Sequence, residues 1–290
     1  MSARRSPSPS AVLAVVSFGV FIAADDLTVA ATMLRQIIGD LRIPLPEGMG
    51  EAAWIVNAYL VAYVAVMPFM GRLSDVVGRR KVYAGSLVVF LAGSIWVAQA
   101  DSLGWFIAGR VLTAIGGGAM VPVALAVIGD VFEERRRATA LGVLGAVDTI
   151  GWVWGPLFGA MLVRFLDWRW QFHLNVPLAL AGIVAVWWAL REHDRPSERR
   201  HMDWGAAAAL SAALVGLNVA LLSTGQISGV GELVELADLA PDRSLPVLPI
   251  GLAAVAAFAL FLWLEWRSRD PLVDLRLFAL PNVSAALTVN

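Results

Sequence analysis

Eight long runs of apolar residues make up most of this 290-residue chain, and they constrain its fold more than any other feature. A helix needs roughly 20 mainly apolar residues to cross about 30 Å of hydrocarbon. Hydrophobic residues form 59% of the chain, which is more than a soluble domain buries. We therefore predict an all-α membrane protein, a multi-span helical bundle with spans at 12–36, 52–71, 82–100, 104–129, 138–163, 172–190, 205–223 and 246–266.

The composition excludes several kinds of chemistry. The chain has no cysteine, so it has no disulfide, no thiolate nucleophile and no cysteine-ligated metal. Of its three histidines, His193 and His201 lie in a charged loop and His173 lies near a predicted helix end, and we assign none of them a role. No G-x4-G-K-[ST] loop is present, and the basic clusters lie at predicted membrane edges. We expect no metal, no cofactor, no nucleic-acid partner and no enzymatic activity.

The distribution of basic residues predicts the orientation of the chain. If residues 1–10 are cytoplasmic, the cytoplasmic segments hold 16 of the 22 Lys and Arg residues and the outer segments hold five. The remaining basic residue, Arg110, lies inside a span. By the positive-inside rule this imbalance predicts a cytoplasmic N-terminus. We expect the protein to lie in the plasma or inner membrane of the cell.

A short glycine- and arginine-rich segment, Gly71-Arg72-Leu73-Ser74-Asp75-Val76-Val77-Gly78-Arg79-Arg80-Lys81, joins the second and third predicted spans. Taken alone, it is a basic loop that sets topology. It also matches G-x-L-[SA]-D-x-x-G-R-[RK] residue by residue, and so resembles the signature of the major facilitator superfamily. The resemblance implies a cytoplasmic latch formed by Gly71, Asp75, Gly78, Arg79 and Arg80, with Asp75 held against a helix of a C-terminal half beyond Asn290.

The fifth predicted span carries a second pattern. Gly142, Gly151, Gly155, Pro156 and Gly159 are similar to the antiporter motif of drug/proton exchangers, with Ala160 in place of its last glycine. Three of these glycines recur every four residues, so they form a smooth face that another helix can approach closely. Generic packing of small residues is the alternative interpretation. Trp152 and Trp154 lie in the same span, where they either line a pocket for aromatic or cationic substrates or face lipid.

Further segments resemble the fourteen-span drug:proton antiporter branch, the EmrB/QacA type. They are Asp26-Leu27-Thr28-Val29, the Trp54 and Tyr59 positions, and Asp167 to Phe172 followed by Asn175-Val176-Pro177. The segments 32–35 and 43–46 also resemble mycobacterial exporters of triacylglycerides and drugs. One departure is Arg110-Val111-Leu112-Thr113-Ala114, where the branch has R-x-x-Q-G.

This resemblance implies a division of the chain. Residues 11–191 would form a six-span N-terminal transporter domain, 192–203 a cytoplasmic loop, and 204–266 two additional linker spans. Residues 267–290 would hold a second cytoplasmic loop and the start of a ninth span near Pro281. Because that apolar segment stops at Asn290, we expect the chain to be the N-terminal portion of a longer transporter, with the C-terminal half as its missing partner.

Four ionisable residues lie inside the predicted spans: Asp25, Asp26, Arg110 and Asp148. Charges in hydrocarbon are costly and normally face a partner or a water-filled cavity. At 1.5 Å per residue, Asp26 and Arg110 come to similar depths, and Asp148 and Thr113 lie near the midplane. These five residues are our candidates for proton coupling and the substrate cavity. A static Asp26–Arg110 ion pair is the alternative, and periodicity favours Asp25 as cavity-facing whereas the motif favours Asp26.

The function implied is secondary active export of amphiphilic or hydrophobic small molecules, coupled to protons, by alternating access within the lipid bilayer. A lipid or glycolipid exporter of the same superfamily is one alternative. A membrane-embedded enzyme is disfavoured, since the loops hold no convergent His, Asp or Lys groups. A non-transporting membrane scaffold or sensor is the other alternative.

Overall fold

The computed structural model describes residues 7–44, 48–191, 202–223 and 247–268, together with Leu272. Within these residues every regular element is a helix, and no strand occurs. The helices are α1 (Pro9–Asp40), α2 (Met49–Ala52), α3 (Trp54–Val77), α4 (Arg79–Ala98), α5 (Leu103–Val131), α6 (Glu134–Phe165), α7 (Arg169–Ala189), α8 (Trp204–Ser223) and α10 (Val247–Arg267).

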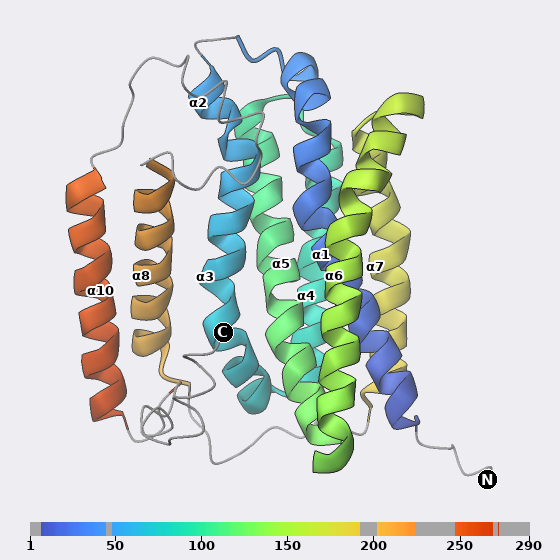
Figure 1. Ribbon diagram of the computed structural model, residues 1–290, viewed down its shortest axis with the longest axis vertical. Helices are drawn as coiled ribbons and strands as arrows, with labels where there is room; N and C mark the ends of the chain where they lie inside the picture. Colours follow the sequence, from blue (N-terminus) through green and yellow to red (C-terminus); the bar gives the residue numbers. More distant parts are fainter. Residues whose placement is uncertain (1–6, 45–47, 192–201, 224–246, 269–271, 273–290) are drawn as a thin grey trace.

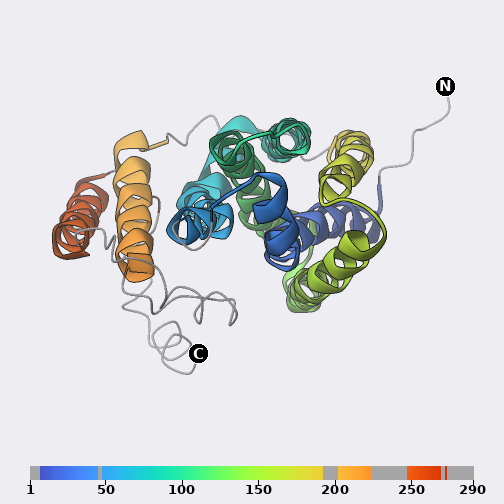
Figure 2. The same cartoon turned by 90° about the horizontal axis from the view of Figure 1, so that it is seen from above.

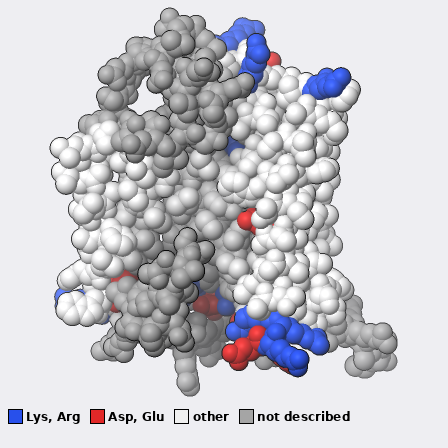
Figure 3. Space-filling view, in the orientation of Figure 1, with Lys and Arg blue, Asp and Glu red and all other residues white. Residues whose placement is uncertain are grey.

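The eight predicted spans are confirmed as eight helices that are long and apolar enough to cross a membrane, in the order expected. The long helices run side by side along one axis (Figure 1). On the face shown in Figure 3, charged side chains gather at the two ends of the bundle, and the described surface between them is almost entirely uncharged. Residues 224–246, the predicted loop residues 192–201 and the predicted apolar segment from Pro281 lie outside the described residues.

Local chemistry accounts for several helix ends. The side chain of Ser8 accepts a hydrogen bond from the Ala11 amide at 3.3 Å, and Pro9 occupies the first turn of α1. α6 begins with Glu134 and carries Arg164 in its last turn, so both charges complement the helix dipole.

The helices pack in a pattern that relates the first three spans to the next three. α1 packs along α6 and α3 packs along α5, while α4 contacts both α5 and α7. If α1, α3 and α4 are replaced in order by α5, α6 and α7, and the reverse, the α1–α6 pair becomes the α5–α3 pair. This is the arrangement of a 3+3 repeat. α8 and α10 pack against each other at the side of the bundle, with α8 alongside α3 (Figure 2).

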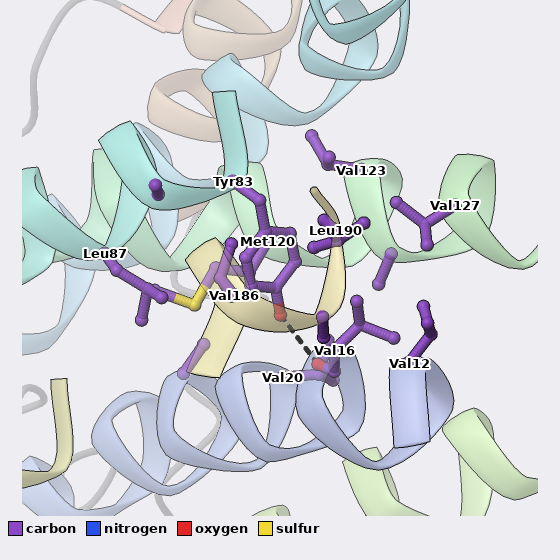
Figure 4. Packing of buried hydrophobic residues seen from close by; sticks show 14 of the residues in the cluster. Val12, Val16, Val20, Tyr83, Leu87, Met120, Val123, Val127, Val186 and Leu190 are labelled. Carbon is purple, nitrogen blue, oxygen red and sulfur yellow. Dashed lines mark hydrogen bonds between the residues drawn. The ribbon is translucent and has the colours of Figure 1, made fainter. Parts of the chain in front are cut away.

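The six-helix part has two large apolar clusters, one toward each end, and a small third cluster of Leu27, Tyr59, Tyr63 and Ala114. The first joins α1, α4, α5, α6 and α7, and Figure 4 shows it around Tyr83, whose hydroxyl donates to the Val16 carbonyl at 2.6 Å. The second gathers at the other end and includes Val29, Met33, Ile37, Phe106, Trp168 and Phe172. On α1 the residues between the two clusters include Asp25 and Asp26, and on α5 they include Arg110. The charged groups therefore lie in a layer between two apolar clusters.

One sequence-based expectation needs correction. The segment Gly71–Lys81 was expected to be a turn, but α3 continues to Val77 and α4 begins at Arg79, so Gly78 alone connects them. Gly78 has φ of 113°, a conformation that L side chains rarely adopt. The glycine therefore reverses the chain in a single residue.

Candidate functional site

A buried ion pair joins α1 to α5. Arg110 Nη1 donates to Asp26 Oδ2 at 2.7 Å, and Arg110 Nη2 donates to the Asp26 backbone carbonyl at 3.1 Å. Both side chains have no exposed surface. A pair this deeply buried is held by directed hydrogen bonds on charged groups, which are stronger than those between neutral groups.

Two amide side chains of α7 extend this pair into a network. Asn175 Nδ2 donates to Asp26 Oδ1 at 3.0 Å and lies 3.4 Å from Ser94 Oγ of α4. Gln171 Nε2 donates to Asp25 Oδ2 at 2.8 Å. Asp25 and Asp26 are both buried, although they are successive residues on one helix, because α7 supplies a polar partner to each.

An aromatic side chain of α3 covers the guanidinium group. The ring centroid of Tyr59 lies 4.1 Å from Arg110 Cζ, a distance typical of a cation–π contact. The Tyr59 hydroxyl donates to the Ala23 carbonyl at 3.3 Å, which ties α3 to α1 beside the network. Thr113 is buried one turn beyond Arg110 on α5, and its hydroxyl donates to the Arg110 carbonyl at 2.9 Å.

The other predicted cavity residues lie elsewhere. Asp148 is half-buried on α6 and is not among the residues that hydrogen bond within this network. Trp152 and Trp154 are 48% and 47% exposed, and Trp154 stacks on Phe158 of its own helix with ring centroids 6.0 Å apart. These tryptophans lie on the outer surface of the described bundle.

The antiporter-like residues divide into two groups. Gly151, Gly155 and Gly159 are buried against α1, and an added Cβ at each would meet α1 atoms closer than van der Waals contact allows. Gly142 is exposed, and a Cβ there would meet nothing within 4 Å. Pro156 lies inside α6, which continues through it. The smooth glycine face is therefore the surface on which α6 packs along α1.

The facilitator-type signature forms a network at one end of the bundle. Arg79 pairs with Asp75 of α3 and with Asp130 of α5, the latter at 2.9 Å, and also donates to Ser74 Oγ. Its Nη1 donates to the Gly71 carbonyl at 3.1 Å. The guanidinium of Arg80 lies 4.4 Å from the ring centroid of Trp187 on α7. This end of α3, α4 and α5 is thus held together by Arg79.

Trp168 and Arg169 form a comparable network at the opposite end. Trp168 Nε1 and Arg169 Nη1 each donate to Asp40 Oδ2 at 3.0 Å. Arg169 Nη2 donates to the Ala100 carbonyl at 3.1 Å, and the Trp168 amide donates to Gln36 Oε1 at 3.0 Å. The start of α7 is therefore fixed to the ends of α1 and α4.

Sequence reasoning missed Gln171 and Asn175 as site residues. Both residues belong to the motif that carried the resemblance to the antiporter branch, but they were considered only as motif positions and given no role in the site. Their spacing of four residues places both amides on one face of α7, and two amides on one face of an apolar helix are a signal for a polar neighbour. Among the described residues, no group of three or more His, Cys, Asp or Glu side chains could hold a metal ion.

Comparisons with known proteins agree with this architecture. Residues 16–266 match the family model described as Major Facilitator Superfamily. The chain is 38% identical over 262 residues to a triacylglyceride transporter of Mycobacterium tuberculosis, covering 89% of this chain and 48% of that protein. It is 30% identical over 294 residues to multidrug resistance protein 3 of Bacillus subtilis, covering 99% and 53%.

Among solved structures, the transporter PepTSo of the POT family superposes with a TM-score of 0.56 at 17% identity, covering 87% of this chain and 52% of that chain. This likeness concerns the fold. The chain spans about half the length of the curated relatives it matches.

Proposed function

Because the chain belongs to the major facilitator superfamily, we propose that it forms the N-terminal part of a proton-coupled exporter of amphiphilic or hydrophobic small molecules. Residues 11–191 are its six-span domain and residues 204–266 its two linker spans, joined by the cytoplasmic loop 192–203. The observation that carries this proposal is the buried Asp26–Arg110 pair, extended by Asp25 and two α7 amides and enclosed between two apolar clusters.

The chemistry of the network suits an exchange of protons for substrate. A proton that binds a buried carboxylate removes a charge, and so changes which partner Arg110 prefers. Such a change can bias a domain between two orientations, since facilitator halves rock about a central site near the bilayer midplane. In this mechanism protons enter from outside, and substrate leaves on the same side when the two halves reorient.

The class of substrate is proposed from the relatives and from the surface of α6. The mycobacterial relatives are named triacylglyceride transporters, and the Bacillus relatives are named for multidrug transport. The 38% identity to the first group makes lipid export the second candidate function. Exposed Trp152 and Trp154 offer a flat apolar surface that suits a bulky hydrophobic molecule in either case.

Efflux driven by an imposed proton gradient is the direct test. The protein, expressed from its complete gene and reconstituted in vesicles, should move a fluorescent amphiphile or a labelled triacylglyceride only while the gradient lasts. A proton ionophore should stop that movement, and protein-free vesicles provide the baseline. Transport that continues unchanged without a gradient would contradict proton coupling, and preference between the two probes separates drug from lipid export.

Asp148→Asn is expected to reduce proton-driven efflux by at least tenfold while the protein still inserts in the membrane. The half-buried carboxylate lies on α6 and is not part of the Asp26–Arg110 ion pair, so its loss leaves those contacts intact. Initial efflux rates at matched membrane abundance measure the effect. Asp101→Asn, at an exposed position between α4 and α5, serves as a control for loss of one carboxylate. Equal rates for Asp148→Asn and the unmutated protein would remove Asp148 from the coupling site.

The proposed orientation predicts opposite labelling of two single-cysteine variants. The chain itself contains no cysteine, so Asp101→Cys and Arg136→Cys introduce unique thiols at exposed positions. A membrane-impermeant maleimide should label Asp101→Cys on intact cells, because the α4–α5 connection lies outside. It should label Arg136→Cys only after the cells are permeabilised. The reverse pattern would invert the orientation.

A further inference from the structure

Two buried oxygens of the α1–α7 contact have no hydrogen-bond donor among the residues that the structure describes. They are Asp25 Oδ1 and Gln171 Oε1. The two side chains already share one hydrogen bond, from Gln171 Nε2 to Asp25 Oδ2 at 2.8 Å. A buried acceptor without a donor loses its hydrogen bonds to water and gains none in return, so a donor at these two oxygens would stabilise the fold.

The orientation of the Gln171 amide is set by its other neighbour. Its Nε2 lies 2.8 Å from Asp25 Oδ2 and 3.5 Å from Asn175 Oδ1, so both N–H hydrogens meet acceptors. Asn175 in turn directs its Nδ2 to Asp26. Turning the Gln171 amide over would place its oxygen against two other acceptors, so the amide keeps this orientation and Oε1 is the atom left without a donor.

The charge balance of the layer also favours a bound proton. Asp25, Asp26 and Arg110 would together carry one uncompensated negative charge if both carboxylates were ionised. The remaining ionisable neighbours do not supply a positive charge: Tyr59 on α3 donates its hydroxyl to the Ala23 carbonyl, and Asp148 on α6 is acidic. An unpaired charge in such surroundings is disfavoured, and the group takes up a proton instead.

We propose that Gln171 and Asp25 form a proton-binding site, a carboxylic acid–amide pair that holds one proton between Asp25 Oδ1 and Gln171 Oε1. The proton comes from a hydronium ion: one O–H bond of hydronium breaks, a water molecule is released, and one O–H bond forms at Oδ1. Asp25 then donates to Gln171 Oε1 while Gln171 Nε2 donates to Oδ2. The two reciprocal bonds use all four atoms, and the layer becomes electrically neutral.

The two neighbouring carboxylates thus have different roles. Asp26 receives donors on both oxygens, from Arg110 at 2.7 Å and Asn175 at 3.0 Å, which favours its charged form. Asp25 has a donor on one oxygen only. In transport, Asp25 is then the carboxylate that binds and releases the proton. This consequence rests on the proposed function, whereas the presence of the bound proton does not.

Thermal unfolding in detergent tests the pair. Asparagine carries an N–H donor where the protonated acid carries O–H, so Asp25→Asn should melt at or above the temperature of the unmutated protein. Asp25→Leu has the volume but neither hydrogen bond, and should melt several degrees lower. A lower melting temperature for Asp25→Asn than for Asp25→Leu would overturn the proposal. So would a sodium-specific rise in the melting temperature of the unmutated protein, relative to choline, that Asp25→Asn abolishes, because a cation would then occupy the site.

Infrared spectroscopy supplies a readout that folding alone does not move. The protonated acid should give a carboxylic C=O band at neutral pH that Asp25→Asn removes, and that Gln171→Leu shifts to higher frequency because the carbonyl loses its donor. Absence of such a band overturns the proton site even if efflux remains gradient-driven. A band in a protein that shows no gradient-driven efflux overturns the proposed function and supports the proton site.

Discussion

Asp26→Asn is expected to abolish proton-driven efflux and to lower the free energy of unfolding by about 3–5 kcal/mol. The substitution leaves Arg110 fully buried without its charged partner, since the guanidinium lies among Asp26 and the rings of Tyr59 and Phe172. Removing one member of a buried ion pair costs more than the pair contributed, because the other charge stays desolvated and uncompensated. Denaturant unfolding in detergent measures the loss.

A double variant separates stability from function in this prediction. Asp26→Leu combined with Arg110→Met removes both charges and keeps apolar volume, so it should recover most of the lost stability. Efflux should remain absent in the double variant, because no exchangeable charge pair is left. Asp26→Asn with unchanged unfolding and unchanged efflux would show that the pair matters neither for folding nor for coupling. The expected loss of stability in Asp26→Asn contrasts with the unchanged or higher melting temperature expected for Asp25→Asn. The same substitution at two adjacent carboxylates should therefore change stability in different ways.

The spans could be read from the sequence because apolar length is a local property. A run of about 20 apolar residues must cross the membrane as a helix whatever its neighbours are. The rise per residue along each helix predicted similar depths for Asp26 and Arg110. In the structure Arg110 Nη1 lies 2.7 Å from Asp26 Oδ2. Local patterning did not decide between Asp25 and Asp26, and both are buried.

The amides of α7 could not be placed from local pattern. Gln171 and Asn175 reach the carboxylates only because α7 crosses α1 at their height, which depends on packing among four helices. The chain reversal at Gly78 could not be predicted either, because the polar residues before it suggested a loop. In the structure the Ser74 hydroxyl donates to the Gly71 carbonyl of the same helix, and Asp75 pairs with Arg79 at the start of α4. Polar composition there reflects the Arg79 network rather than an irregular backbone.

The layered core explains why a few polar contacts can have large effects. The apolar clusters above and below keep water from the Asp26–Arg110 pair, so each hydrogen bond in that layer acts in a medium of low polarity. The α1–α6 contact runs past the same layer, because an added Cβ at Gly155 would lie only 2.8 Å from the Asp25 carbonyl oxygen. Packing of α6 and the geometry of the two carboxylates are therefore coupled through the backbone of α1.

Gly155→Ala is accordingly expected to lower the free energy of unfolding by about 1–3 kcal/mol and to reduce efflux more than tenfold. The new Cβ would overlap Thr28 Oγ1 and crowd the Asp25 carbonyl, and the α1 backbone can relieve that contact only by moving away from α6. Melting temperature and efflux rate at equal abundance measure the two effects.

Gly142→Ala is the matched control, since the same helix presents an exposed glycine whose Cβ would meet nothing within 4 Å. There the higher helix propensity of alanine should raise stability by up to about 1 kcal/mol, and efflux should not change. Opposite signs at Gly155 and Gly142 would place the function of the glycine series in its contact with α1. Equal effects at the two positions would instead mean that the glycines act through the flexibility of α6 itself, and the coupling of that helix to the carboxylate layer would have to be abandoned.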